Sequence, residues 1–258
     1  MSILSEQQFQ QIIAVVREAG RLLFDRAATR AIENKGPTDF VTDVDLTVQK
    51  TLKAKLAELT PEIAFVGEEN ASAIDLSQNL WILDPVDGTT NLIHNLQHSA
   101  ISLALVEQGT VTAGIVYNPF VEEMYTALKG AGARLNGAPI AVSGTCELAD
   151  ALMHVGTNAG HRELADISFR WLRTFYDKAR DIRRFGSAAL DLCYVACGRG
   201  DGFVEKALMP WDVAAGILIL EEAGGTTSAE DGTPIPLDRL SSVVASNGKI
   251  HPEILANL

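Results

Sequence analysis

The stretch Trp81-Ile82-Leu83-Asp84-Pro85-Val86-Asp87-Gly88-Thr89-Thr90-Asn91 places an apolar run directly before a group of polar residues. The apolar run predicts a buried strand that ends at Asp84, and Pro85 is expected to turn the chain because its ring fixes φ. Asp87 follows three residues later, close enough to share one metal ion with Asp84. Gly88 permits an unusual backbone angle, and Thr89 suits the start of a helix, where backbone N–H groups bind anions. The stretch therefore predicts metal ligands beside a phosphate cradle; the alternative is an Asp-Pro turn followed by a helix cap.

Two further acidic segments lie at the ends of predicted elements. Gly67-Glu68-Glu69 follows a short apolar run, and Asp212 in Pro210-Trp211-Asp212 precedes an apolar helix. Two carboxylates about 4 Å apart repel each other by roughly 4 kcal/mol at an effective dielectric of 20, whereas a hard divalent cation between them reverses the sign. These acids therefore favour a cation site. The alternatives are a solvated loop for Glu69 and a helix cap for Asp212.

A third acidic segment, residues 35–45, precedes another predicted helix. Asp43 or Asp45 can serve there as a helix cap. The run Asp43-Val44-Asp45-Leu46-Thr47 also fits the DxDxT pattern of haloacid-dehalogenase phosphatases, in which the first Asp is a nucleophile. That pattern expects a continuous apolar strand before it, and the sequence has none here, so this interpretation is disfavoured.

Hydrophobic periodicity predicts an α+β half followed by an α/β half. Apolar residues at spacings of three and four predict a helix over residues 12–23 and a second helix after Asp45. The remaining helices are expected over 163–176, 187–197, 212–223 and 252–258. Strands are expected over 62–66, 80–83, 101–106, 111–117, 124–127, 134–136, 151–155, 202–205 and 241–246.

Composition limits the classes of partner. The net charge of −12 repels nucleic acid and anionic membranes, and it also repels a phosphorylated substrate unless cations occupy the site. Three sparse cysteines, Cys146, Cys193 and Cys197, argue against a disulfide framework and fit a reducing compartment. No signal-peptide pattern and no apolar run of membrane-spanning length is found, so a cytoplasmic protein is expected.

Taken together, the motifs resemble the inositol monophosphatase family, the lithium-sensitive, magnesium-dependent phosphatases. The resemblance extends over nearly the full chain and rests on four ordered segments. These are residues 67–69, residues 84–91, Ile182-Arg183-Arg184-Phe185-Gly186-Ser187-Ala188-Ala189-Leu190, and Trp211-Asp212-Val213-Ala214-Ala215-Gly216 followed by Glu222-Ala223-Gly224-Gly225.

The resemblance implies the layered αβαβα sandwich that this family shares with fructose-1,6-bisphosphatase. It implies a single domain over residues 1–258, with a metal and phosphate half over 1–142 and a substrate half over 143–258. Members of the family are usually dimers, so a homodimer is expected.

The resemblance also implies a ligand set and a mechanism. Glu68, Asp84 and the Val86 carbonyl would hold a first metal, and Asp84, Asp87 and Asp212 a second, with a third, weaker ion near Glu68. All ligands are oxygens, which suits Mg²⁺ or its substitute Mn²⁺. Thr89 and Asp45, with Glu68, would orient and activate a water molecule, and Gly88 and Thr89 would bind the phosphate.

Substrate contacts are implied for the second half of the chain. Glu205 would bind substrate hydroxyls, with Thr157 and Ala189 nearby and with Asp87 and Asp212 also facing the substrate. Arg183 and Arg184 are either surface charges or substrate contacts, and the surface interpretation is favoured. His94 is interpreted as a packing residue or a residue behind the site.

The resulting expectation is a phosphatase that hydrolyses inositol 1-phosphate by metal-activated water. Histidinol phosphate, fructose 1,6-bisphosphate and 3′-phosphoadenosine 5′-phosphate stay open as substrates of the same site. An alternative of another class is a regulatory protein that contacts RNA polymerase or RNA, although the net charge disfavours direct RNA binding.

Overall fold

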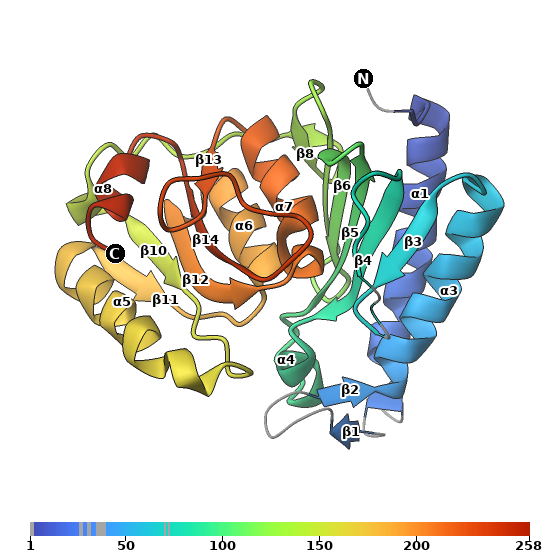
Figure 1. Cartoon of the computed structure of the whole chain (residues 1–258), viewed down its shortest axis with the longest axis horizontal. Helices are drawn as coiled ribbons and strands as arrows, with labels where there is room; N and C mark the ends of the chain where they lie inside the picture. The colour runs from blue at the N-terminus through green and yellow to red at the C-terminus, as the bar shows by residue number, and fades with distance from the viewer. Residues whose placement is uncertain (1–2, 26–27, 30–31, 35–39, 70, 72) are drawn as a thin grey trace.

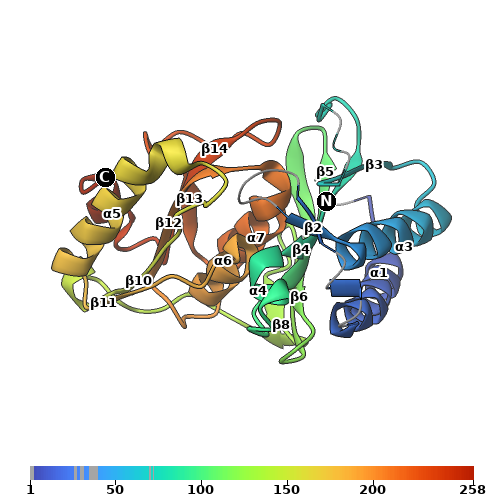
Figure 2. The same ribbon diagram turned by 90° about the horizontal axis from the view of Figure 1, so that it is seen from below.

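The computed structural model describes residues 3–25, 28–29, 32–34, 40–69, 71 and 73–258. Its helices and sheets stack in five layers, which Figures 1 and 2 show from two directions. Helices α1 and α3 cover one face of a seven-stranded sheet, α6 and α7 lie between this sheet and a five-stranded sheet, and α5 and α8 cover the far face of the second sheet. This is the predicted αβαβα sandwich.

The first layer forms because two helices each present an apolar stripe to the sheet. Helix α1 (Glu6–Ala19) starts with a capping box between Ser5 and Gln8. It buries Phe9, Ile12, Val16 and Ala19 at helical spacing and continues into a 3₁₀ turn at Gly20–Phe24. Helix α3 (Asp43–Leu59) buries Val44, Val48, Leu52 and Leu56.

The seven-stranded sheet is buried on both faces, which explains why its strands are apolar throughout rather than alternating. Leu80 and Ile82 of β4 face the middle layer, whereas Trp81 and Leu83 face α1 and α3. Its strands, in spatial order, are β3 (Ala64–Gly67), β4 (Leu80–Asp87), β5 (Ala100–Glu107), β6 (Thr110–Asn118), β7 (Glu123–Leu128), β8 (Ala133–Leu135) and β9 (Ala138–Pro139). Only the β3–β4 pair among them is parallel.

The middle layer consists of α6 (Ala188–Ala196) and α7 (Pro210–Glu222), which are buried almost all round. Both belong to the largest core cluster, which joins the two sheets. Helices that are apolar on every side need such a position between two layers. Cys193 is fully buried on α6, and Cys197, which follows the last residue of the helix, is partly buried.

The five-stranded sheet and its outer helices complete the stack. The strand order is β11 (Asp181–Arg183), β10 (Leu152–Val155), β12 (Gly202–Leu208), β14 (Ser241–Ser246) and β13 (Thr226–Ser228). Helices α5 (Ala165–Lys178) and α8 (His251–Leu255) pack on it through Trp171, Phe175 and Ile254. Smaller elements are α4 (Thr89–Ile93), the hairpin β1 (Ile32–Asn34) and β2 (Phe40–Thr42), and 3₁₀ turns at Leu148–Asp150 and Arg162–Leu164.

Several predicted boundaries are wrong. Strand β4 does not end at Asp84: it continues through Pro85 to Asp87, and its pairing with β5 shifts register between Asp84 and Asp87. Proline is tolerated at such a bulge because no ladder donor is needed there. Helix α3 begins at Asp43 rather than after Asp45. The short strands β1, β2, β9, β11 and β13 were not predicted, since they are only two or three residues long.

Among the described residues, no helix combines the length and the hydropathy needed to cross a membrane. Residues 35–39 of the third acidic segment lie outside the described residues.

Candidate active site

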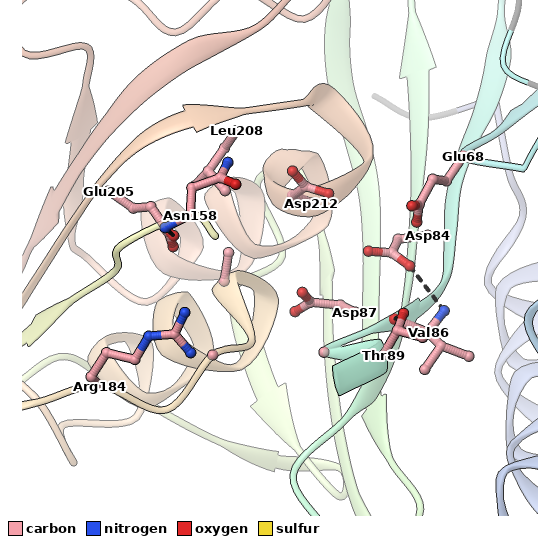
Figure 3. A pocket seen from close by; sticks show the side chains of 13 residues that line it. Glu68, Asp84, Val86, Asp87, Thr89, Asn158, Arg184, Glu205, Leu208 and Asp212 are labelled. Carbon is pink, nitrogen blue, oxygen red and sulfur yellow. Dashed lines mark hydrogen bonds between the residues drawn. The ribbon is translucent and has the colours of Figure 1, made fainter. Parts of the chain in front are cut away.

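A small pocket opens where the ends of β3, β4 and β12 meet α4 and the starts of α6 and α7 (Figure 3). Its volume is about 190 Å³, which suits a small metabolite rather than a macromolecule. The described residues that line it are Glu68, Asp84, Val86, Asp87, Gly88, Thr89, Asn158, Arg184, Gly186, Ala188, Glu205, Leu208 and Asp212. The four acids predicted to bind metal therefore line one pocket.

Glu68 and Asp84 come together because β3 and β4 run parallel and end at the same edge. Gly67 pairs with Leu83, and the Glu68 N–H donates to the Leu83 carbonyl at 3.0 Å, so the next residue of each strand is adjacent. The loop after Glu68 is held by Gln49 of α3, whose side chain bonds both the N–H and the carbonyl of Glu69. Glu69 itself is buried and lies outside the pocket lining.

The bulge in β4 aims Asp87 into the same space as Asp84. One oxygen of Asp84, Oδ1, accepts from the Val86 N–H at 2.9 Å. One oxygen of Asp87, Oδ2, accepts from the Ser187 hydroxyl and from the Ala189 N–H at 2.8 Å, both at the start of α6. Each carboxylate thus has one oxygen fixed by the protein.

Asp212 follows the same pattern from a third element. It stands in the first turn of α7, where its Oδ2 accepts from the Met209 N–H at 2.8 Å. The predicted helix-cap role is therefore real, and the second oxygen is left for the pocket. In Figure 3 the carboxylates of Glu68, Asp84, Asp87 and Asp212 lie around a common space.

The electrostatics of this cluster are unfavourable without a cation. Burial raises the pKa of Asp84 well above its usual range, and the charges of Glu68, Asp87 and Asp212 raise it further. Burial and the charges of Glu68 and Asp87 likewise raise the pKa of Asp212. For Asp87 burial dominates and raises the pKa to about 7.

The donor set fits a hard divalent cation, because it offers only oxygens and a net negative charge. Within the described ranges, however, no three or more His, Cys, Asp or Glu side chains already stand at the spacing of a closed metal site. The chemistry of the donors, rather than a preformed ligand shell, is therefore what fits the cation.

Thr89 links the pocket to Asp45. The Thr89 hydroxyl lies 3.2 Å from Asp45 Oδ1 and 3.0 Å from the Val86 carbonyl. The other Asp45 oxygen accepts from the N–H and the hydroxyl of Thr42, so Asp45 both caps α3 and supports Thr89. Burial raises the pKa of Asp45, although the hydrogen bonds from Thr42 and Thr89 oppose this shift. Asp43 is exposed and outside the pocket lining, which leaves it no role as a nucleophile.

Glu205 lies across the pocket from Glu68 and Asp84, at a register shift between β12 and β14. Its Oε1 accepts from the Asn158 N–H at 2.8 Å. Burial raises the pKa of Glu205 to about 7; the Asn158 N–H and the charge of Arg184 oppose the shift, and Asp191 and Asp87 add to it. A carboxyl group in this environment is suited to hydrogen-bonding hydroxyl groups.

Two predicted substrate contacts, Thr157 and Ala189, lie next to the pocket but outside its lining: the Thr157 hydroxyl accepts from Arg184, and the Ala189 N–H donates to Asp87. Arg183 and Arg184 are both exposed. Arg184 also lines the pocket, which favours the substrate-contact alternative for it, whereas Arg183 pairs with Asp181. His94 is exposed rather than packed.

Three polar residues in or beside the pocket were missed by sequence reasoning: Asn158, Ser187 and Asn91. The Asn91 amide donates to the carbonyls of His98, Phe185 and Gly186, and so joins α4 to the loop before α6. Its place at the end of the opening polar stretch was a usable signal, since a buried amide requires several partners. Asn158 carried no comparable signal.

The chain is similar to known proteins over nearly its whole length. The model of the inositol monophosphatase family matches residues 5–258. An inositol-1-monophosphatase of Mesorhizobium japonicum is 39% identical, over 95% of this chain and 93% of that protein. The Nus factor SuhB of Pseudomonas aeruginosa is 35% identical, over 95% of this chain and 93% of that protein. The solved structure of an IMPase from Thermotoga maritima has a TM-score of 0.88 at 33% identity, covering 97% of this chain and 96% of that one.

Proposed function

This chain belongs to the inositol monophosphatase family, and from that premise we propose that it is a Mg²⁺-dependent phosphatase that hydrolyses inositol 1-phosphate. The observation that carries the proposal is the set of three aspartates, from β4 and α7, that line one small pocket and each have one oxygen anchored by a backbone N–H. Such anchoring orients carboxylates for a cation in advance.

Mg²⁺ is the proposed ion because the donors are all oxygens and include no thiol or imidazole. Glu68, Asp84, the Val86 carbonyl, Asp87 and Asp212 would hold two or three ions, and Mn²⁺ would substitute. The bound ions would supply charge neutralisation for the phosphoryl group and would acidify a water molecule.

The residues of the chain would position and deprotonate that water. The Thr89 hydroxyl can accept a hydrogen bond from the water while it donates to Asp45, which lies 3.2 Å away. Because burial raises the Asp45 pKa, this carboxylate is a stronger proton acceptor than an exposed one. Gly88 and Thr89, which line the pocket, would contact the phosphate.

Glu205 would accept hydrogen bonds from hydroxyls of the alcohol portion, which favours a polyol over a second phosphate at that end. The pocket volume of about 190 Å³ is compatible with one inositol ring and its phosphate. Histidinol phosphate, fructose 1,6-bisphosphate and 3′-phosphoadenosine 5′-phosphate are the alternative substrates.

Phosphate release tests the proposal. The parent should release phosphate from inositol 1-phosphate only with Mg²⁺ or Mn²⁺ present, and Asp87→Asn should lower kcat/KM by at least about a hundredfold. Asp43→Asn, a change to an exposed aspartate outside the pocket, serves as the control. Equal rates for Asp87→Asn and the parent would remove the proposed site, and a preference of tenfold, about 1.4 kcal/mol, for another substrate of the panel would reassign it.

A regulatory role is the second candidate, because relatives with 35% identity are named Nus factor SuhB. A protein that contacts RNA polymerase would do so through its surface, so the Asp87→Asn variant would keep that activity while losing phosphatase activity. A homodimer, a cytoplasmic location and inhibition by Li⁺ are proposed on the family alone.

A further inference from the structure

Arg184 is a lone basic side chain in a pocket that five acids line. Among the described residues that form the pocket, the acids are Glu68, Asp84, Asp87, Asp212 and Glu205, and Arg184 has the single basic side chain. Figure 3 shows its guanidinium directed into the pocket on the side of Glu205 and Asn158, away from Glu68 and Asp84. Arg184 is therefore placed toward the alcohol portion of a substrate rather than toward the cation cluster.

The protein holds Arg184 in this position through its neighbours. Its Nε donates to the Thr157 hydroxyl at 3.2 Å. Gly186, two residues on, has φ +83°, and a Cβ atom there would overlap Arg184 Nη1, so the glycine leaves room for the side chain to fold back over its own loop. The arginine, although exposed, is thus held by one hydrogen bond and has room to lie over Gly186.

The loop that carries Arg184 is itself fixed. The Phe185 ring packs against His98, His154 and Tyr194, with ring centroids 5.1 to 5.7 Å apart. The Asn91 amide donates to the carbonyls of Phe185 and Gly186 at 2.9 and 3.2 Å. A partly buried aromatic anchor and two hydrogen bonds from the Asn91 side chain to backbone carbonyls therefore hold the loop beside the arginine, which helps to pre-organise its direction.

Arg184 and Glu205 share a side of the pocket without forming a pair. The charge of Arg184 opposes the rise in the pKa of Glu205 that burial causes. Within the described residues, Arg184 forms no ion pair, and its Nη1 and Nη2 donate to no acceptor. Glu205 uses Oε1 to accept from Asn158 and leaves Oε2 without a donor. At this end of the pocket, the Arg184 guanidinium therefore offers hydrogen-bond donors and the Glu205 carboxylate offers an acceptor to the same space.

We propose that Arg184 is a specificity-determining residue that, together with Glu205, recognises adjacent hydroxyl groups of a polyol phosphate. The guanidinium donates to hydroxyl oxygens, while Glu205 accepts the hydroxyl hydrogens. Each hydroxyl is both donor and acceptor, so a vicinal diol satisfies the two groups at once. The inference rests on the proposed phosphatase function and adds a recognition element to the same site.

The charges at this end of the pocket favour a polyol over a second anion. A carboxylate or phosphate on the leaving group would be attracted by Arg184 and repelled by Glu205 and Asp87. The net gain in its binding free energy would therefore be small. A leaving group without hydroxyls would leave both the guanidinium and the carboxylate unpaired. A polyol is the one chemistry among these that uses both groups.

The test compares kcat/KM of the parent and Arg184→Met on three phosphate esters with Mg²⁺ present. Inositol 1-phosphate carries a polyol, p-nitrophenyl phosphate has no hydroxyls on its leaving group, and 2-phosphoglycolate carries a second anion. We expect Arg184→Met to lose about 10- to 100-fold on inositol 1-phosphate, mainly through a higher KM, and to lose at least tenfold less on either other ester. Arg184→Lys should recover part of the loss, since it retains the charge but not the fork.

Two further variants separate recognition from folding. Arg183→Met removes the neighbouring arginine, which pairs with Asp181 on the surface, and should match the parent on all three esters. Thr157→Val removes the support of Nε and retains the guanidinium, so it should show a smaller loss with the same substrate order. The unfolding midpoint of each variant checks that the fold is retained.

Each remaining outcome counts against the proposal. Equal losses on all three esters would place Arg184 at the phosphate or in folding, and a largest loss on 2-phosphoglycolate would make it an anion site. No loss on inositol 1-phosphate would remove Arg184 from recognition. All three results leave the phosphatase function standing, whereas a parent that releases no phosphate from any ester overturns both proposals.

Discussion

The carboxyl group of Glu205 is buried, and its ionisation opposes folding. Replacing Glu205 with glutamine should therefore stabilise the metal-free protein at high pH. The side chain is only 8% exposed, and burial raises its pKa from the ordinary 4.5 to about 7. The difference of about 2.5 pH units corresponds to about 3 kcal/mol at 1.36 kcal/mol per unit. Because the folded-state pKa is above the unfolded one, the stabilising contribution is complete below pH 4.5 and is lost as the pH rises through about 7.

Urea unfolding of the parent and Glu205→Gln, in a chelator at pH 5 and pH 8.5, measures this effect. The variant should exceed the parent by about 3 kcal/mol at pH 8.5 and by about 1 kcal/mol at pH 5. Glutamine can still accept the 2.8 Å hydrogen bond from the Asn158 N–H. Glu58→Gln, at an exposed position of α3, is the control and should stay within about 0.5 kcal/mol of the parent at both pH values. A stability difference that does not change with pH would refute the reasoning.

Three other changes test the site. Asp45→Asn should lower kcat by about 10²- to 10³-fold with little change in KM in steady-state assays, because Thr89 loses its proton acceptor; a loss confined to KM would contradict this role. Asn91→Ala should lower the free energy of unfolding by about 1–3 kcal/mol in urea titrations, because three carbonyls lose one donor; an unchanged midpoint would mean that the link between α4 and the loop is dispensable. Mg²⁺ at a hundredfold excess over Kd should stabilise the parent by about 2.7 kcal/mol in thermal scans, and Asp212→Asn should lose most of this gain; a similar gain in both would place the ion elsewhere.

The cation cluster shows how much local sequence determines. The run from Trp81 to Asn91 contains a buried strand, two aspartates three residues apart and a glycine before a helix start, all of which are local properties of the chain. With the segments around Glu68 and Asp212, this run was enough to predict four of the acids that line the pocket, and it carried the family resemblance that implied the layered fold. Hydrophobic periodicity and the residue types that bind metal can be read directly from the sequence, so they can be predicted without a structure.

The side of the pocket that contains Arg184 is formed by contacts between segments that are distant in the sequence, so it could not be predicted from local patterns. Arg184 looks like one of two equivalent arginines in the sequence, and only Thr157, Gly186 and the packing of the Phe185 ring select it for the pocket. The course of β4 through Pro85 was likewise decided by its pairing with β5. Which way a side chain points follows from strand register and from the segments packed beside it, and those are properties of the folded chain, because the contacting residues lie tens of positions apart.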